Sequence, residues 1–349
     1  MTHRGMFLFP HRVPPKVVKR ITAKRRNDNS IGDASMLQWR SDFFTHRNTI
    51  AVMHILVVAL VYYLAVSVIA GSILGAGFAT NLSGRPNDRQ LRALERIGTY
   101  IPLTLNGIGG GLIARAGERR PTIVYVHGRS ANRMELAPLA AAMFNEGYNA
   151  VLWDSESRQI SYGPKEIEQL RGIVAFVRSD PHVVMDEVFI VGFSLGAAIA
   201  IGAAAADNDH DIRGIVADSS YANLKDVASR YMTVFGAIPA AVVWPARTVT
   251  FATAKAMHGI DFDSRNPADW AQTVTCPVFL IHGKSDKTIP FEHSEQIFQR
   301  LNMYKELWLV EGTGHTEAFS RSPATYVSRV ADFLDGIRAN GRVAQFPKH

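Results

Sequence analysis

The 349-residue sequence contains one segment in which a buried strand must turn directly into a buried helix. Residues 188–191 form a run of β-branched and aromatic side chains, which is typical of a parallel strand covered on both faces. Residues 197–206 are rich in alanine and indicate a buried helix. The two are joined by Gly-Phe-Ser-Leu-Gly, residues 192–196, so a polar serine stands between two glycines inside an apolar segment.

A strand, a G-x-S-x-G motif and a helix in this order predict a nucleophile elbow, a sharp turn that exposes the serine hydroxyl. In such a turn the serine, here Ser194, takes a strained backbone conformation, and the flanking glycines have no Cβ to collide with neighbouring elements. The alternative is a structural serine in an ordinary turn. The motif alone is weak evidence, but its place between a strand and a helix favours the elbow.

The charge of the chain is concentrated at its N-terminus. Residues 1–50 contain ten Lys and Arg against three Asp, whereas the remaining residues contain 28 of each sign. The net charge of +7 therefore belongs to a tail, and a basic nucleic-acid-binding face on the folded body is not expected. The single cysteine, Cys276, excludes an internal disulfide and a cysteine-based zinc site.

A long apolar segment follows this tail. No Asp, Glu, Lys or Arg occurs between Arg47 and Arg85, and residues 50–70 are almost wholly apolar. About 20 apolar residues cross a bilayer as a helix, so we predict a transmembrane helix over residues 48–78. A cleaved signal peptide would have a shorter apolar region nearer the N-terminus, and a core helix is seldom apolar on all sides.

The orientation of this span follows from the charges beside it. The basic residues 16–26 favour a cytoplasmic N-terminus by the positive-inside rule, which places the rest of the chain outside the cytoplasm. The arginines within residues 85–96 weaken that asymmetry. We expect residues 1–47 to be a disordered basic tail, 79–97 a linker, and 341–349 a short C-terminal tail.

Strand-like and helix-like patterns alternate through residues 98–340, which predicts an α/β domain with a mostly parallel sheet and helices on both faces. The Gly-rich residues 107–111 are expected to form a turn between two early strands. The expected strands are 122–126, 149–153, 188–192, 214–218, 278–282 and 307–311, and the expected helices are 132–146, 164–179, 195–206, 291–302 and 324–338.

Three chemically active residues each follow one of these strands. Ser194 follows 188–192, Asp286 follows 278–282, and His315 follows 307–311. In open α/β sheets, sites gather at the carboxyl ends of the strands. The chain order serine, acid, histidine is that of the α/β-hydrolase triad. These groups fill every catalytic role, so we expect no cofactor and no metal.

Other residues compete for the same roles. Asp218 also follows a strand, and some hydrolases take their acid from that position, but the H-G-x-x-D-x-x-x-P setting of Asp286 is more specific. We expect His293 on the surface of a helix. His127 and His282 belong to H-G turns and are expected to be structural. Asp154 could cap or pair near the site, but we expect it to be solvated at the surface.

Residues 98–340 resemble the α/β-hydrolase superfamily, in particular its serine-aminopeptidase-like and dienelactone-hydrolase-like branches. The resemblance is carried by H-G after 122–126, by "LAPLAAAMFNEGY", "GFSLG", "CPVFLIHGKSDKTIP" and "GTGH". It implies that Ser194 is the nucleophile, Asp286 the triad acid and His315 the general base. It also implies an oxyanion hole made by the backbone N–H groups of Leu195 and Arg129.

One segment departs from the pattern of these relatives. Many carry D-x-R-x-H-G-x-S where this chain has "DSESRQISYG", which leaves the triad intact but weakens any transfer of a particular substrate. Residues 221–263 are apolar and aromatic, and they are either a cap over the active site or an ordinary packing helix. As a cap, their lining would favour an acyl or aromatic group in the substrate.

The sequence thus predicts a membrane-anchored serine hydrolase that cleaves an ester, or else a thioester or amide. The expected substrate is a small-molecule or lipid-like acyl compound. Two alternatives stay open. An acyltransferase would use the same acyl-enzyme, and a catalytically silent hydrolase-like domain would act as a membrane sensor or binding module. The presence of all three triad residue types argues against the silent domain.

Overall fold

The computed structural model describes residues 30–80, 84–155, 157–234 and 236–340. Contacts divide the chain into two units, residues 1–62 and 63–349, and the division falls inside the first helix, α1 (Ser30–Phe78). All contacts discussed below lie within the second unit. The expected disorder of residues 1–29 and the expected tail at 341–349 lie outside the described residues.

Helix α1 begins at Ser30, within residues 1–47, which were expected to be a disordered tail. Residues 30–47 contain no proline, so a helix once formed in the apolar segment can continue back through them. Within the described part of the chain, one helix, at Gln38–Phe78, is long and apolar enough to cross a membrane. The expected linker contains a short helix, α2 (Asp88–Leu94), which a capping box at Asn87 begins.

The centre of the domain is a single eight-stranded sheet in the order β1-β2-β4-β3-β5-β6-β7-β8. The strands β3 to β8 run parallel, and β1 and β2 are antiparallel additions at one edge. The bounds are β1 (Thr99–Pro102), β2 (Ile108–Ala114), β3 (Arg120–Val126), β4 (Asn149–Ser155), β5 (Val183–Phe193), β6 (Gly214–Asp218), β7 (Val278–Gly283) and β8 (Lys305–Val310).

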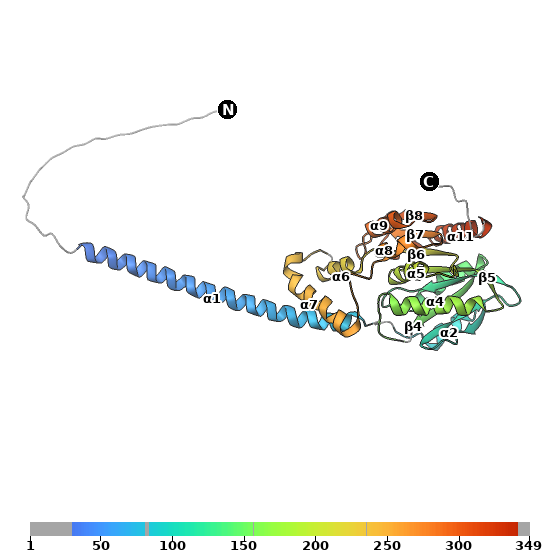
Figure 1. Ribbon diagram of the computed structural model, residues 1–349, viewed down its shortest axis with the longest axis horizontal. Coiled ribbons are helices and arrows are strands. Elements are labelled where there is room, and N and C mark those ends of the chain that lie inside the picture. The colour runs from blue at the N-terminus through green and yellow to red at the C-terminus, as the bar shows by residue number, and fades with distance from the viewer. Residues whose placement is uncertain (1–29, 81–83, 156, 235, 341–349) are drawn as a thin grey trace, which may run out of the picture. The chain divides into compact units, whose positions relative to one another are not determined.

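Helices cover both faces of this sheet, as its sequence pattern predicted (Figure 1). Successive strand residues face opposite sides, so Val124 lies in the core cluster to which α4, α5 and α9 contribute, whereas Ile123 lies in the cluster to which α3 and α11 contribute. The helices are α3 (Ala137–Asn145), α4 (Pro164–Arg178), α5 (Leu195–Ala205), α6 (Leu224–Met232), α7 (Ala240–His258), α8 (Pro267–Trp270), α9 (Glu292–Arg300), α10 (Ala318–Arg321) and α11 (Pro323–Asn340), with 3-10 turns at Arg133–Leu136 and Ala271–Thr273.

The Gly-rich residues at 107–111 differ from the expectation of a turn. Gly107 does belong to the turn, with a φ of 73°, but the next three glycines lie inside strand β2. A Cβ on Gly110 would lie 2.3 Å from the carbonyl oxygen of Leu152, and one on Gly111 would lie 2.4 Å from the ring of Tyr100. The glycines are needed because β4 and the Tyr100 side chain approach the strand closely.

The glycines of the G-x-S-x-G motif give a prediction about stability. A Cβ on Gly192 would lie 2.3 Å from the backbone carbonyl oxygen of Gly196, so Gly192→Ala should lower the free energy of unfolding by about 2 kcal/mol or more. Gly172, in the middle of α4, has no atom within 4 Å of such a Cβ. Gly172→Ala is therefore the control and should raise the stability by about 0.5–1 kcal/mol. Urea unfolding measures both, and a Gly192→Ala protein as stable as the wild type would contradict this packing.

Candidate active site

Ser194 occupies the turn between β5 and α5, at the carboxyl edge of the sheet. Its φ of 54° and ψ of −115° are strained for a residue with a side chain. The conformation is held by the backbone, since the Ser194 N–H donates to the carbonyl of Asp218 at 2.8 Å. A Cβ on Gly196 would lie 2.1 Å from the carbonyl oxygen of Val126, so only glycine allows the first turn of α5 to approach β3 so closely.

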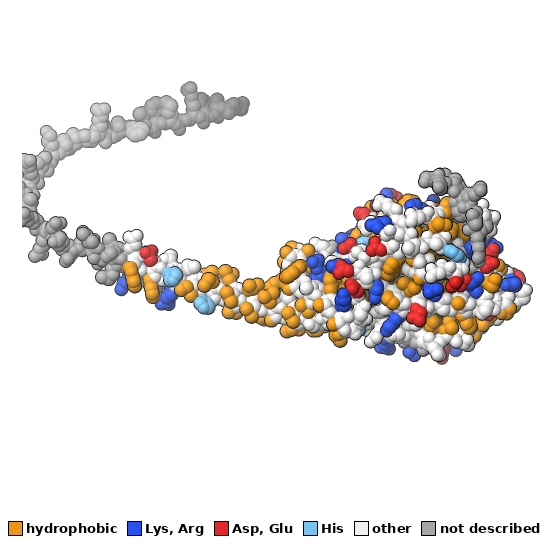
Figure 2. Space-filling view, in the orientation of Figure 1, with side chains coloured by type: hydrophobic (Ala, Val, Ile, Leu, Met, Phe, Trp, Pro, Cys, Tyr) orange, Lys and Arg blue, Asp and Glu red, His pale blue; other side chains and the backbone are white. Residues whose placement is uncertain are grey.

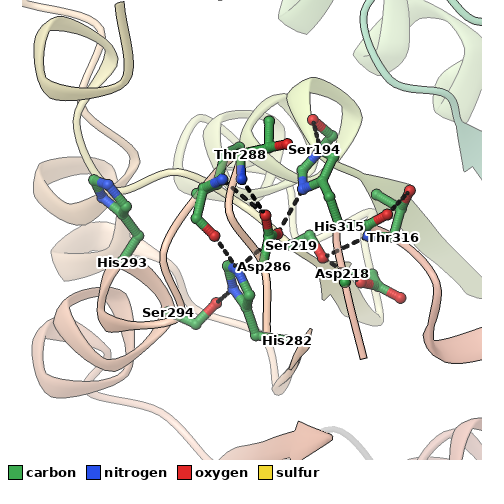
Figure 3. Close-up of polar contacts among 12 residues, drawn as sticks. Ser194, Asp218, Ser219, His282, Asp286, Thr288, His293, Ser294, His315 and Thr316 are labelled. Atoms are coloured by element: carbon green, nitrogen blue, oxygen red, sulfur yellow. Dashed lines mark hydrogen bonds and ion pairs between the residues drawn. The ribbon is translucent and has the colours of Figure 1, made fainter. Parts of the chain in front are cut away.

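His315 lies between Ser194 and Asp286 (Figure 3). Its Nε2 is 2.9 Å from the Ser194 hydroxyl, and its Nδ1 is 2.6 Å from Oδ2 of Asp286. An ionised carboxylate only accepts hydrogen bonds, so Nδ1 carries the proton and Nε2 is left to accept from the hydroxyl. The structure thus brings together the three residues that the sequence singled out, in the order needed for proton transfer away from the serine.

The Asp286 carboxylate is held from its other side by backbone and side-chain donors. The N–H groups of Thr288 and Ile289 donate to Oδ1 at 2.8 and 2.9 Å. Burial alone would raise the pKa of Asp286, but hydrogen bonds from His282 and His315 outweigh it and hold the pKa well below its usual range. Asp286 is therefore ionised at neutral pH in a fixed orientation.

His282 is a site residue whose role sequence reasoning missed. It is fully buried at the end of β7, and its Nε2 lies 2.8 Å from the Ile289 carbonyl and 3.3 Å from Oδ2 of Asp286. Nε2 therefore carries the proton, and Nδ1 accepts from Ser294 at 2.6 Å. The signal in the sequence was a histidine inside an apolar strand, four residues before the acid.

Asp218 does not take the place of Asp286. Its carboxylate accepts from the hydroxyls of Ser219 at 2.8 Å and Tyr326 at 3.1 Å, and Ser219 in turn accepts from the Thr316 N–H at 3.2 Å. Asp218 thus supports the loop that carries His315 (Figure 3). Burial raises the pKa of Asp218 to about 6.

The two residues expected to supply oxyanion-binding N–H groups lie on either side of Ser194. Leu195 is the first residue of α5, where a backbone N–H has no acceptor within its own helix. Arg129 follows Gly128, whose Cβ, if it had one, would lie 3.3 Å from the Ser194 Cβ. Both backbones are thus near the hydroxyl.

The side chain of Arg129 is bound to the end of α1. Its guanidinium donates to the carbonyl of Phe78, the last residue of α1, at 3.3 Å and lies 5.3 Å from the centre of the Phe78 ring. It also lies 6.0 Å from the ring centre of Tyr162, whose hydroxyl donates to the same carbonyl at 3.0 Å. The end of α1 is therefore tied to the loop beside Ser194.

Two other expectations were wrong. His293 is buried, because it lies on the inner face of amphipathic α9, where it accepts from the Ala222 N–H at 3.2 Å. Burial lowers its pKa. Asp154 is not a solvated carboxylate, because the end of β4 points it at Arg133, whose N–H and guanidinium donate to it at 2.6 and 2.8 Å, and His127 lies 3.3 Å away.

A small cavity lies beside this site. Its volume is about 50 Å³, and its lining includes His127, Gly128, Trp153, Leu195 and Ile199. It has room for a few water molecules. Among the residues that the structure describes, no group of three or more His, Cys, Asp or Glu side chains is arranged to hold a metal ion.

Known proteins share this architecture. The BD-FAE family profile matches residues 113–301, which include Ser194 and Asp286. The uncharacterized protein YfhR of Escherichia coli K12 is 23% identical over 218 residues, covering 61% of this chain and 69% of YfhR. The esterase Pf2001 of Pyrococcus furiosus superimposes with a TM-score of 0.58 at 22% identity, over 74% of this chain and 98% of the esterase. Est1E of Butyrivibrio proteoclasticus superimposes with a TM-score of 0.51 at 16% identity, over 69% of this chain and 99% of Est1E.

Asp218 makes the stability of the fold depend on pH. Its carboxyl keeps a proton up to about pH 6 in the folded state but loses it near pH 4 (about the usual pKa) in the unfolded chain. The folded state binds more protons in this window, so the stability contributed by Asp218 is lost as the pH rises through it. We expect the free energy of unfolding of the wild type, relative to Asp218→Asn, to fall from about pH 4 to about pH 6 and then stay level. Urea unfolding in detergent measures this difference, and a rise with pH would contradict the assignment.

Proposed function

The chain belongs to the BD-FAE family of the α/β-hydrolase superfamily, and from that premise we propose that it is a membrane-anchored serine hydrolase that cleaves carboxylic esters. One observation carries the proposal: His315 is within hydrogen-bond distance of both Ser194 and Asp286. A hydroxyl is a poor nucleophile until a neighbouring imidazole accepts its proton, and this arrangement provides that acceptor.

The proposed reaction has two steps that share one covalent intermediate. In the first, Ser194 Oγ attacks the ester carbonyl carbon while its proton passes to Nε2 of His315. The C–O bond to the alcohol then breaks, His315 gives the proton to the departing oxygen, and the acyl group stays on Ser194. In the second, His315 takes a proton from water, the resulting hydroxide attacks the acyl-enzyme, and the acid leaves as Ser194 regains its proton.

The neighbouring groups lower the barrier in defined ways. Asp286 keeps the imidazole in the tautomer that accepts at Nε2 and stabilises the imidazolium that forms. His282 acts through Asp286, because its hydrogen bond helps to keep the carboxylate ionised and in place. The N–H groups of Leu195 and Arg129 would stabilise the oxyanion, each contributing about 3 kcal/mol at the transition state.

An ester is the substrate class that the comparisons favour, because the esterase Pf2001 and the protein Est1E share this fold. A thioester or amide would pass through the same intermediate. The anchor is α1, whose apolar section is long enough to cross a bilayer. The basic residues before it support a cytoplasmic N-terminus, with the hydrolase domain on the opposite side.

The first test removes the nucleophile. Ser194→Ala deletes one hydroxyl at the edge of the sheet, so it should lower kcat for a short-chain aryl ester by on the order of 10⁶-fold and leave the fold intact. Circular dichroism and urea unfolding provide the control for folding. An Ala variant that is folded and retains even a tenth of the wild-type rate would exclude Ser194 as the nucleophile.

The second test separates the two buried aspartates. Asp286→Asn removes the acceptor of the Nδ1 proton and should lower kcat by about 10⁴-fold. Asp218→Asn is the matched control, because Asp218 only supports the loop of His315, and we expect a loss below about tenfold. Steady-state kinetics of both variants decide the point. If Asp218→Asn is the more damaging change, the triad acid has been assigned to the wrong strand.

A further inference from the structure

The connection between α6 and α7 is free of charge over an unusual length. From Tyr231 to Ala246 the sequence contains no Asp, Glu, Lys, Arg or His, and Arg230 and Arg247 stand at its two ends. We call the described residues of this range the hairpin. Four of its large side chains are between 44% and 57% exposed: Tyr231, Val234, Val242 and Trp244. A surface in water rarely gathers so many apolar side chains in one segment.

Helix α7 packs closely along the last turns of α1. Small residues stand every four positions on the facing side of α1, at Ser67, Gly71 and Gly75. A Cβ on Gly71 would lie 2.5 Å from the carbonyl oxygen of Ala246, and one on Gly75 would lie 2.6 Å from that of Thr250. Such backbone contact through a small-residue stripe is typical of helices that associate within a membrane.

Two further contacts show which residues of α1 and α7 lie side by side. The Tyr63 hydroxyl donates to the carbonyl of Val242, near the start of α7. At the other end, Nε2 of His258 donates to the carbonyl of Ala76 at 2.9 Å. The helices therefore run parallel, and the start of α7 lies farther from the hydrolase domain than its end.

This register places the hairpin beside apolar residues of the span. The almost wholly apolar section of α1 ends at Ala70, next to the residue that contacts Ala246, and Arg247 follows at once. From Gly71 to Tyr63 the helix rises by roughly 12 Å, which is less than half the thickness of a bilayer core. The start of α7 thus lies at the depth of the acyl chains, with Arg230 and Arg247 at its base. Figure 2 shows hydrophobic side chains at this end of the domain.

Several backbone donors of the described part of the hairpin turn are paired within it. The N–H groups of Gly236 and Ile238 both donate to the Thr233 carbonyl, at 3.1 and 2.9 Å, and that of Ala237 donates to Val234 at 3.2 Å. The next residue, Pro239, has no N–H. A non-helical segment can enter a bilayer only when its polar backbone groups are paired in this way.

The base of the hairpin adjoins the candidate active site. Arg230 donates to the carbonyl of Lys287, the residue after Asp286, at 3.3 Å. On the α1 side, Arg129 bonds to Phe78. The Ser194 site therefore lies just below the level at which the hairpin would leave the bilayer.

We propose that the hairpin is a second membrane element, which enters the leaflet beside α1 and returns, and that it holds the Ser194 site against the lipid headgroups so that the substrate is an ester of a lipid in that leaflet. The inference rests on the proposed hydrolase function for its substrate and on the span of α1 for its geometry.

The depth of the hairpin can be measured with a single fluorescent probe. Full-length protein first has its single cysteine removed by Cys276→Ala. Val242→Cys then adds one cysteine, which is labelled with an environment-sensitive dye before the protein is reconstituted in phosphatidylcholine vesicles. The control carries the dye at Met185→Cys instead, an exposed position on β5. Bromines on the lipid acyl chains should quench the probe at 242 at least twofold more strongly than the one at 185, and aqueous iodide should do the reverse. Quenching of both probes by iodide alone, or shielding of the 242 probe from both quenchers by a protein contact, would overturn the membrane element.

The substrate claim has its own test. Trp244→Glu puts a charge on the exposed side of the hairpin, which should lower hydrolysis of a phospholipid ester in vesicles by about tenfold or more. Hydrolysis of a soluble short-chain ester should stay within twofold of wild type, as should both activities of the control Met185→Glu. Equal activity of Trp244→Glu and wild type on vesicles would overturn the inference. Equal losses of activity on the vesicle ester and on the soluble ester would also overturn it. Val234→Glu is a second variant that repeats both measurements independently. Wild-type protein inactive on the soluble ester would instead contradict the proposed function.

Discussion

The close approach of three backbone segments at the end of β5 is the constraint on which the site depends. Gly192 lets β5 approach the first turn of α5, and Gly196 lets that turn approach β3, within distances that no side chain allows; this packing keeps Ser194 in its strained conformation. The same turn directs the Ser194 hydroxyl toward His315 and leaves the Leu195 N–H beside it. The geometry of the nucleophile and half of the expected oxyanion hole therefore follow from one feature of backbone packing.

Much of this arrangement could be predicted from the sequence, because strand periodicity and chain order are local signals. Each of the three triad candidates follows an apolar run, and parallel strands carry their ends to the same edge of the sheet. What could not be predicted depends on contacts between distant segments or on the shape of a turn. The pairing of Asp154 with Arg133 arises only when the loop after β3 folds over the end of β4. The contact of His282 with Asp286 at 3.3 Å is local, but it depends on the shape of the turn after β7, which the strand pattern does not specify. The start of α1 at Ser30 reflects propagation of a helix past the apolar boundary, which composition does not mark.

The last part of α1, from Tyr63 onward, belongs to the same compact unit as the hydrolase domain. The last turns of α1 pack on α7, and Phe78 accepts hydrogen bonds from Arg129 and Tyr162 beside the site. A flexible tether would leave an enzyme free to act on soluble esters at any distance from the bilayer. With α1 as the proposed membrane span, the short, bonded connection seen here would instead hold the site at one height, which suits the proposed lipid ester substrate.

Mass spectrometry of the covalent adduct tests the central claim, that Ser194 is an activated nucleophile, most directly. Full-length protein is treated with a fluorophosphonate, digested and sequenced by tandem mass spectrometry. The predicted result is one adduct per chain, on the peptide that contains Ser194, with labelling reduced by orders of magnitude in His315→Ala because the hydroxyl then lacks its base. An adduct on a different serine, or labelling of Ser194 that does not depend on His315, would contradict the claim.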